Sequence, residues 1–226
     1  MARDKQYRDN AQKFDRDRLH SDEEAIGIIK SLGTKKFDET VDIVVRLGVD
    51  PRKADQMIRG TVALPAGTGK DVRVAVFAQG EAATAAREAG AEFVGADDLA
   101  AEIEGGMTDF DVAIATPDMM PVVGKLGKVL GPKGLMPNPK MGTVTPNIGE
   151  AVKLAKSGQV QFKTEKNGIV QAGIAKSNFD AKNIVENINS FVDTIKKSKP
   201  SGAKGTFIKK ISLSSTMGVS VNCEIN

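Results

Sequence analysis

The segment Gly67-Thr68-Gly69-Lys70 has the residue types that hold a nucleotide phosphate, because glycine allows close backbone approach and lysine neutralises charge. A P-loop, however, needs a glycine five positions before the glycine that precedes the lysine, and a serine or threonine after the lysine. The chain has Leu64 and Asp71 at these positions. The segment Ala78-Gln79-Gly80-Glu81 follows a predicted strand but carries one glycine where a dinucleotide-binding loop carries three. Neither segment predicts a nucleotide site, and a nucleotide-dependent enzyme stays the alternative function.

Other catalytic groups are scarce in the sequence. One histidine, His20, and one cysteine, Cys223, cannot form a zinc cluster or an internal disulfide. We expect His20 to be solvated and Cys223 to be a small buried hydrophobe. The carboxylates of Asp97-Asp98 and of Glu102 and Glu104 are expected at the start and on the surface of a helix. The sequence therefore predicts no catalytic residue, no metal and no cofactor, and a protein that is not an enzyme.

Three segments instead combine the residue types that bind RNA. Cations meet phosphates, small polar groups meet ribose hydroxyls, and flat apolar groups meet bases. Lys35–Thr40 places two lysines and Phe37 before a strand, Lys163–Gly168 places two lysines around a turn, and Ser214–Gly218 offers three hydroxyls and a methionine. The alternatives are that Phe37 is a core aromatic and that the serines form an ordinary turn. All three segments together favour RNA binding.

The hydrophobic pattern predicts two lobes, the first of them discontinuous. The 226 residues have 40% hydrophobic content, enough for a core, and lack an apolar run of about 18 residues. Residues 1–66 and 159–226 predict an α+β lobe, and residues 67–158 an inserted, three-layer, Rossmann-like βαβ lobe within an α/β fold. The first lobe carries 23 basic and 17 acidic residues and the insert 9 and 12, so their net charges are +6 and −3. The first lobe is the better candidate for binding phosphates.

The individual elements follow from periodicity, caps and turn signals. Ser21-Asp22-Glu23-Glu24 predicts a capping box, Thr40–Leu47 alternates as a half-buried strand, and Asn167-Gly168 predicts a hairpin. Residues 1–20 alternate charges and predict a loosely held segment. Helices are expected at 21–32, 81–89, 97–104, 118–129, 147–156 and 178–197. Strands are expected at 40–47, 61–64, 72–77, 92–94, 112–115, 160–164, 169–175, 207–214 and 219–224.

The stretch Leu130–Val144, LGPKGLMPNPKMGTV, is expected to be a stiff cationic loop, neither helix interior nor strand, because it holds three glycines and three prolines. A plain linker is the alternative, but the apolar side chains of Leu135, Met136 and Met141 favour a functional loop.

This stretch also carries a resemblance. GLMPNPKMGTV resembles the signature of the bacterial large-subunit ribosomal protein L-one family, and the resemblance extends from about Ser21 to about Val221. It implies that the first lobe binds a structured element of large-subunit ribosomal RNA at the mobile stalk. It further implies binding to the messenger RNA of its own operon, as a translational repressor. The second lobe would help to release deacylated transfer RNA from the exit site.

The resemblance also implies site residues and a cellular setting. The loop positions Lys133, Gly134, Pro137, Asn138 and Lys140 would serve a hinge or the transfer-RNA side. The implied protein is a cytoplasmic ribosomal component, a monomer when free and without membrane contact. The matched RNA-binding positions are Lys36, Phe37, Thr40, Lys163, Thr164, Lys166, Gln171, Ser215, Thr216, Met217 and Gly218.

The chain departs from the family pattern at several of these positions. Gln171 stands where the family usually has histidine, Lys163-Thr164-Glu165 where Arg-Asn-Asp is common, and Val219 where a small residue or proline is common. Two glycine-bearing crossings, near Gly67 and Gly158, predict a hinge whose opening would expose the first-lobe surface to RNA.

Overall fold

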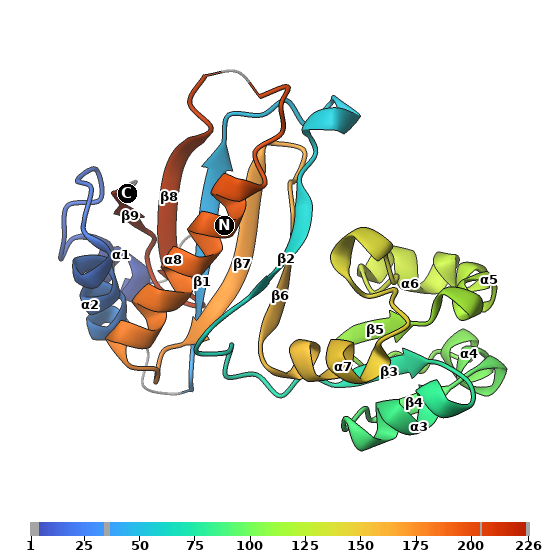
Figure 1. Cartoon of the computed structure of the whole chain (residues 1–226). Helices are drawn as coiled ribbons and strands as arrows, with labels where there is room; N and C mark the ends of the chain where they lie inside the picture. The colour runs from blue at the N-terminus through green and yellow to red at the C-terminus, as the bar shows by residue number, and fades with distance from the viewer. Residues whose placement is uncertain (1–4, 34–36, 204, 225–226) are drawn as a thin grey trace. The chain divides into compact units, whose positions relative to one another are not determined.

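The computed structural model describes residues 5–33, 37–203 and 205–224 (Figure 1). The chain forms two compact units, Met1–Gly69 with Val160–Asn226 (unit 1) and Lys70–Gln159 (unit 2). These bounds separate the same charged residues as the sequence division, so unit 1 has a net charge of +6 and unit 2 of −3. The predicted α/β class with two units of different construction is confirmed.

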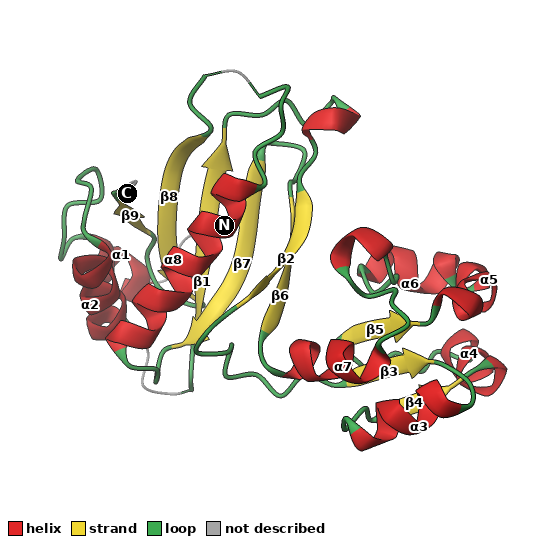
Figure 2. Cartoon of the chain, in the orientation of Figure 1, coloured by secondary structure: helices red, strands yellow, loops and turns green. Residues whose placement is uncertain are grey.

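Unit 1 is built on a four-stranded antiparallel sheet with the order β7-β1-β8-β9 (Figure 2). Strand β1 is central, and its neighbours come from the other end of the chain. The strands are β1 (Thr40–Leu47), β7 (Ile169–Lys176), β8 (Ile208–Ser215) and β9 (Val221–Cys223).

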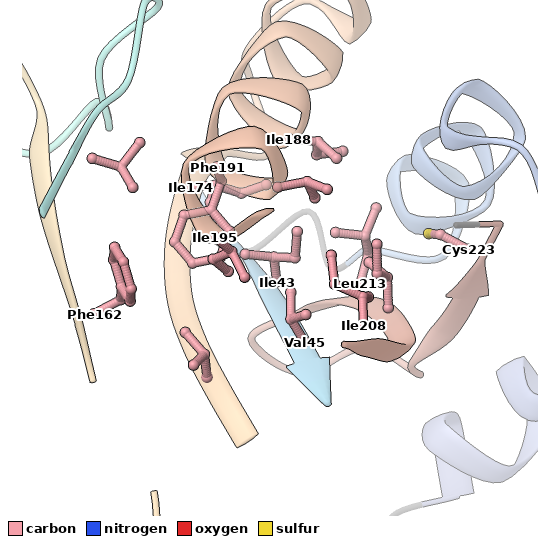
Figure 3. Close-up of a cluster of buried hydrophobic side chains, with 14 of the residues drawn as sticks. Ile43, Val45, Phe162, Ile174, Ile188, Phe191, Ile195, Ile208, Leu213 and Cys223 are labelled. Atoms are coloured by element: carbon pink, nitrogen blue, oxygen red, sulfur yellow. The ribbon is translucent and has the colours of Figure 1, made fainter. Parts of the chain in front are cut away.

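Two helices cover one face of this sheet, α2 (Asp22–Leu32) and α8 (Ala181–Lys197). Figure 3 shows Ile43, Ile174 and Leu213 from three strands meeting Ile188 and Phe191 of α8. All five side chains are buried, which removes their apolar surface from water and stabilises the unit. The predicted alternation of β1 and the apolar stripe of the long helix are confirmed.

The other face of the sheet is open and polar. Along β1, Thr40, Asp42, Val44 and Arg46 alternate with four buried residues and therefore point away from the helices. One registered row crosses all four strands on this face, from Gln171 through Val44 and Ser212 to Asn222. We call this surface the open face.

A two-stranded sheet of β2 (Arg59–Ala63) and β6 (Gln159–Lys163) packs beside the core, with Phe162 edge-on to Phe191 at a ring distance of 5.8 Å. The expected β6–β7 hairpin ladder is wrong, because β6 pairs with β2 and β7 pairs with β1. The predicted tight turn between them does form, with Gly168 at a φ of 72° and its N–H donating to the Glu165 carbonyl. A short 3-10 turn, η1 (Ala54–Gln56), precedes β2.

Unit 2 has a parallel three-stranded sheet with the order β4-β3-β5. Helices α3 and α7 pack on one face, and α4, α5 and α6 on the other, so the predicted three-layer arrangement is confirmed. The strands are β3 (Val74–Phe77), β4 (Phe93–Gly95) and β5 (Val112–Ala115). The helices are α3 (Glu81–Glu88), α4 (Asp97–Glu104), α5 (Met120–Lys125), α6 (Gly127–Lys133) and α7 (Ile148–Lys156), with 3-10 turns η2 (Pro117–Met119) and η3 (Pro139–Met141).

The start of the cationic loop was predicted wrongly. Helix α6 runs to Lys133 and contains Pro132, whereas the sequence placed the loop start at Leu130. Because proline has no N–H, the helix loses one backbone hydrogen bond at Pro132, and it ends at the next residue. The expected helix 118–129 is interrupted at Leu126, where α5 ends and α6 begins.

Residues 5–20 are also more ordered than the sequence predicted, while residues 1–4 lie outside the described part of the chain. Helix α1 (Lys5–Ala11) is tied to α2 by the Asn10 amide, which donates to the Leu32 carbonyl at 3.2 Å. His20 was expected in solvent, but it is buried, and its backbone bonds to the β9 edge at Asn222 and Glu224. Charge alternation failed as a signal because the Asn10 amide and the backbone bonds of His20, and not a periodic apolar pattern, hold these residues.

Within the described part of the chain, no helix combines the length and apolar character that crossing a bilayer requires. The same residues contain no cluster of histidine, cysteine and carboxylate side chains that could hold a metal ion.

Candidate nucleic-acid interface

The first group of predicted site residues lies where β1 begins and β8 ends. The Thr40 N–H donates to the Thr216 hydroxyl at 3.0 Å, and that hydroxyl lies 3.4 Å from the Thr40 carbonyl. The Lys176 ammonium donates to the Thr40 hydroxyl at 3.0 Å. We call Phe37, Glu39, Thr40, Thr216, Met217 and Gly218 the Thr216 cluster.

A buried carboxylate supports the exposed part of this cluster. Glu39 is 1% exposed, and its Oε2 accepts the Met217 N–H at 3.3 Å. The side chains of Phe37 and Met217 are 50% and 61% exposed, although both are large and apolar. A hydrogen-bonded backbone therefore presents Met217 to solvent, and Phe37 adds a second exposed apolar side chain, which is the usual sign of a contact surface.

Gly218 is required by the turn that closes the cluster. Its N–H donates to the Ser215 carbonyl at 3.1 Å, and a Cβ at this position would lie 2.2 Å from the Ser215 hydroxyl. The Ser215 side chain is buried in this turn, so its hydroxyl serves the fold and is not offered to RNA.

The second group surrounds the turn between β6 and β7. Its residues line an open cavity of about 830 Å³, which we call the turn cavity. Lys163 and Lys166 are exposed, and in the described part of the chain neither forms an ion pair. The Gln171 amide donates to the Glu165 carboxylate. The lining residues are Pro51, Met57, Lys163, Thr164, Glu165, Lys166, Asn167 and Gln171.

Thr164 lines the turn cavity but is almost fully buried behind its surface. It is 2% exposed, its hydroxyl accepts the Ile58 N–H at 3.3 Å, and its own N–H donates to the Ile58 carbonyl at 2.8 Å. These bonds hold β6 against the segment before β2. Thr164 is therefore a structural residue, and we leave it out of the candidate contacts.

The two groups lie at opposite ends of β1. Lys176 pairs with Thr40 and Ile169 pairs with Arg46, so the turn cavity lies beside the far end of the strand. At about 3.3 Å per residue the separation is roughly 20 Å. The segments that the sequence singled out for RNA binding therefore form two groups, which are connected by the open face.

One carboxyl on the open face has a perturbed pKa. Partial burial raises the pKa of Asp42, and the neighbouring Lys176 ammonium opposes this rise. The lysine lies beside Thr40, so it counters the negative charge close to the Thr216 cluster.

The predicted loop residues of unit 2 are held by internal bonds. Lys133 ends α6 and its ammonium donates to the Thr108 hydroxyl, while Gly134 adopts a φ of 73° as the helix cap. Asn138 donates its N–H to the Thr143 hydroxyl at 2.8 Å, and Pro137 is buried. Lys36 and the side chain of Lys140 lie outside what the structure describes.

Sequence reasoning missed three contributors to these surfaces. The Glu39 carboxylate accepts the Met217 N–H, and Pro51 and Met57 form the apolar part of the turn cavity. Glu39 could have been found from the sequence, because it directly precedes Thr40, a candidate RNA-binding residue at the start of a predicted strand. Nothing in the sequence around Met57 indicates a binding residue, because a single methionine belongs to no recognisable motif or periodic pattern.

The fold and these surfaces define a two-unit α/β protein whose discontinuous basic unit presents an open sheet face. The sequence profile of the ribosomal protein L1p/L10e family matches residues 29–219. The chain belongs to this family. It is 59% identical over 205 residues to the large ribosomal subunit protein uL1 of Chromobacterium violaceum, which covers 91% of this chain and 89% of that protein. The resemblance found in the sequence is confirmed.

Membership in a ribosomal protein family gives the chain a structural role and not an enzymatic one. The alternative of a nucleotide-dependent enzyme on the inserted unit is therefore set aside, in agreement with the incomplete phosphate-binding motifs at Gly67–Lys70 and Ala78–Glu81.

Proposed function

We propose that this protein is a structural component of the large ribosomal subunit in the cytoplasm and binds large-subunit ribosomal RNA through the open side of unit 1. The observation that carries the proposal is the Thr216 cluster, where a hydrogen-bonded backbone exposes Met217 on the more basic unit and Phe37 is exposed three residues before Thr40. Flat or flexible apolar groups on a fixed frame suit the faces of bases and riboses.

The turn cavity supplies the electrostatic part of the same interface. Lys163 and Lys166 meet phosphates, and Met57, which is 40% exposed, provides an apolar surface between them. The Gln171 amide retains a second N–H after donating to Glu165, so it can still donate to a base or ribose. The family's usual histidine at this position can carry a charge, which the glutamine lacks.

The proposal also assigns a transfer-RNA contact to unit 2 and a role in translational repression to unit 1. The loop with Lys133, Gly134, Pro137, Asn138 and Lys140 contacts transfer RNA in the exit site and assists its release when deacylated. The free protein is a monomer that binds the messenger RNA of its own operon through the same unit 1 surface and represses its translation. Ribosomal and messenger RNA then compete for one surface.

The test compares Met217→Asp with Leu154→Asp in binding to an in vitro transcript of the large-subunit ribosomal RNA. Both side chains are exposed and apolar, but Leu154 lies on α7 of unit 2. We expect Met217→Asp to weaken binding by roughly tenfold or more, because it places a charge beside phosphates and removes an apolar contact. Leu154→Asp should bind as wild type.

Three outcomes contradict the proposal. They are no RNA binding by the wild type, equal effects of the two variants, and an affinity that does not fall as salt rises. The last outcome indicates a protein-binding scaffold instead, because counterion release makes RNA affinity steeply salt-dependent. Thr216→Val is a poorer probe, since the Thr216 hydroxyl also holds the Thr40 backbone. Sequencing the RNA that co-purifies with the protein identifies the target independently.

A further inference from the structure

A depression of about 360 Å³ lies at the edge of unit 1, away from both groups of predicted site residues. It is lined by Arg16, Asp17, Lys210, Ser220 and Asn222. These residues come from the loop before α2, from β8, and from the end of the chain around β9. We call it the edge depression.

Backbone and amide bonds build this depression. The Asn222 amide donates to the Arg16 carbonyl at 2.7 Å, and its oxygen accepts the Ser212 hydroxyl at 3.0 Å. Asn222 therefore fastens the loop at Arg16 to the outer strands of the sheet. Since the bond uses the Arg16 carbonyl, the guanidinium is not needed to hold the loop.

The depression opens on the same surface as the other two groups. Lys210 pairs with Arg46, and both precede residues whose side chains point into the core, so they belong to the open face. Asn222 ends the registered row that begins at Gln171 in the turn cavity. With strands about 4.8 Å apart, that row is roughly 14 Å long.

The cations at this edge lack carboxylate partners. Within the described part of the chain, Arg16, Arg46 and Lys210 form no ion pair. Arg16 Nε is buried there without a hydrogen-bond acceptor. A buried donor without an acceptor is unfavourable, and an external anion that the guanidinium reaches by rotating would supply that acceptor. Asp17 supplies the carboxylate in the lining, which leaves one excess positive charge.

We infer that the edge depression binds a backbone phosphate of the same RNA, as a third contact at the β9 side of the open face. Arginine and lysine neutralise the phosphate, while the Ser220 hydroxyl and the second N–H of the Asn222 amide donate to its oxygens. The contact recognises the backbone and not the base sequence. The inference rests on the proposed function, because it assigns a further part of the RNA footprint.

The experiment measures the affinity of the full chain for the large-subunit ribosomal RNA transcript over a series of KCl concentrations. Arg16→Gln and Lys210→Gln should each weaken binding by roughly threefold to tenfold and lower the slope of log K against log salt by about 1. Arg16→Lys should keep the slope. Asp17→Asn should strengthen binding by about twofold, because it removes a charge that repels phosphate.

The matched control is Arg18→Gln, an exposed arginine of the same loop that lies outside the depression and pairs with Glu24 at 3.8 Å. It should leave the affinity and the slope unchanged. The urea midpoints of all these variants should equal that of the wild type, because the loop is held by backbone and Asn222 bonds.

The outcomes separate this inference from the proposed function. If the wild type binds no RNA, the proposed function fails. If Met217→Asp weakens binding but Arg16→Gln and Lys210→Gln keep the wild-type affinity and slope, this inference alone is overturned. It is also overturned if inorganic phosphate raises the melting temperature of the wild type and not of Arg16→Gln while RNA affinity is unchanged, which indicates a site for a free anion.

Discussion

The two ends of strand β1 differ in construction. At the Thr40 end, the Thr216 hydroxyl and the Glu39 carboxylate accept the backbone N–H groups of Thr40 and Met217, and the Lys176 ammonium donates to the Thr40 hydroxyl. At the Arg46 end, the β6–β7 turn surrounds an open cavity whose lysines form no ion pair in the described part of the chain.

The different construction of the two ends of β1 indicates that they contribute differently to RNA binding in the proposed interface. A preorganised end loses little conformational freedom on binding, so it suits shape-specific contact with a folded RNA. Long, unpaired lysine side chains adapt to the path of a phosphate backbone, and their contribution decreases with salt. The first end would therefore determine which RNA is bound, and the second would add affinity for any RNA nearby.

Gly218→Ala should give the largest effect, because it alters the preorganised end itself. The new Cβ would lie 2.2 Å from the Ser215 hydroxyl, so either this buried side chain must rotate or the turn must shift. We expect a stability loss of about 1–3 kcal/mol, as for other overpacked sites. RNA affinity should fall by roughly tenfold, which corresponds to about 1.4 kcal/mol. Urea unfolding and filter binding measure the two effects.

The control for this substitution is Gly27→Ala. Gly27 lies inside α2, and a Cβ there meets no atom within 4 Å. Alanine in a helix interior should raise stability by about 0.5–1 kcal/mol and leave RNA affinity unchanged. Wild-type RNA affinity in Gly218→Ala would show that the turn geometry does not matter for binding.

Lys166→Gln and Met217→Ser together test the division between the two ends. Removing one phosphate-neutralising lysine should reduce the salt slope by about 1, with a several-fold loss of affinity at physiological salt. Met217→Ser should weaken binding while the slope stays at the wild-type value, since no charge changes. Equal slopes for both variants would contradict the assignment of electrostatic contact to the turn cavity.

Asp42→Asn should have the smallest effect and concerns the face between the two ends. Burial raises the pKa of Asp42, so the folded state binds its proton more tightly than the unfolded state. The stability it contributes is therefore present at low pH and lost as pH rises through its folded pKa, above the ordinary value of 3.8. The asparagine variant should melt higher than wild type at pH 7 and show less stabilisation on acidification.

Melting curves between pH 4 and pH 7 measure this effect, with Asp71→Asn as a control at an exposed carboxylate of unit 2. A wild-type pH profile for Asp42→Asn would mean that this carboxyl does not contribute to the pH dependence of stability.

Much of the fold could be predicted because local chemistry and tertiary structure agree. The alternation of Thr40–Leu47 matches the observed strand, and Ser21 caps α2 by accepting the Glu24 N–H at 3.3 Å. The Glu24 carboxylate, which the capping box directs to the Ser21 N–H, instead lies 3.6 Å from His20 Nδ1. Cys223 is buried as expected, and burial raises its pKa to about 12.

The site was less predictable because a hydroxyl residue in a sequence does not show whether its side chain faces the interior or the surface. Thr164 and Thr216 have the same side chain, yet one bonds to Ile58 in the interior and the other bonds to Thr40 at the surface. The difference depends on which strands pair, and β6 pairs with β2 although its nearest neighbour in sequence is β7. Strand pairing over long separations leaves no local pattern, so the sequence could not show that the candidate residues form two groups at the two ends of β1.

The central position of β1 has a consequence for the order of events during synthesis. Both of its neighbours, β7 and β8, are encoded more than a hundred residues later, whereas unit 2 is one continuous segment. A ribosome making this chain can release a folded unit 2 while β1 still waits for its partners. The proposed RNA surface is then complete only after β8 and the Thr216 cluster have been synthesised, so a nascent chain cannot bind through it before that point.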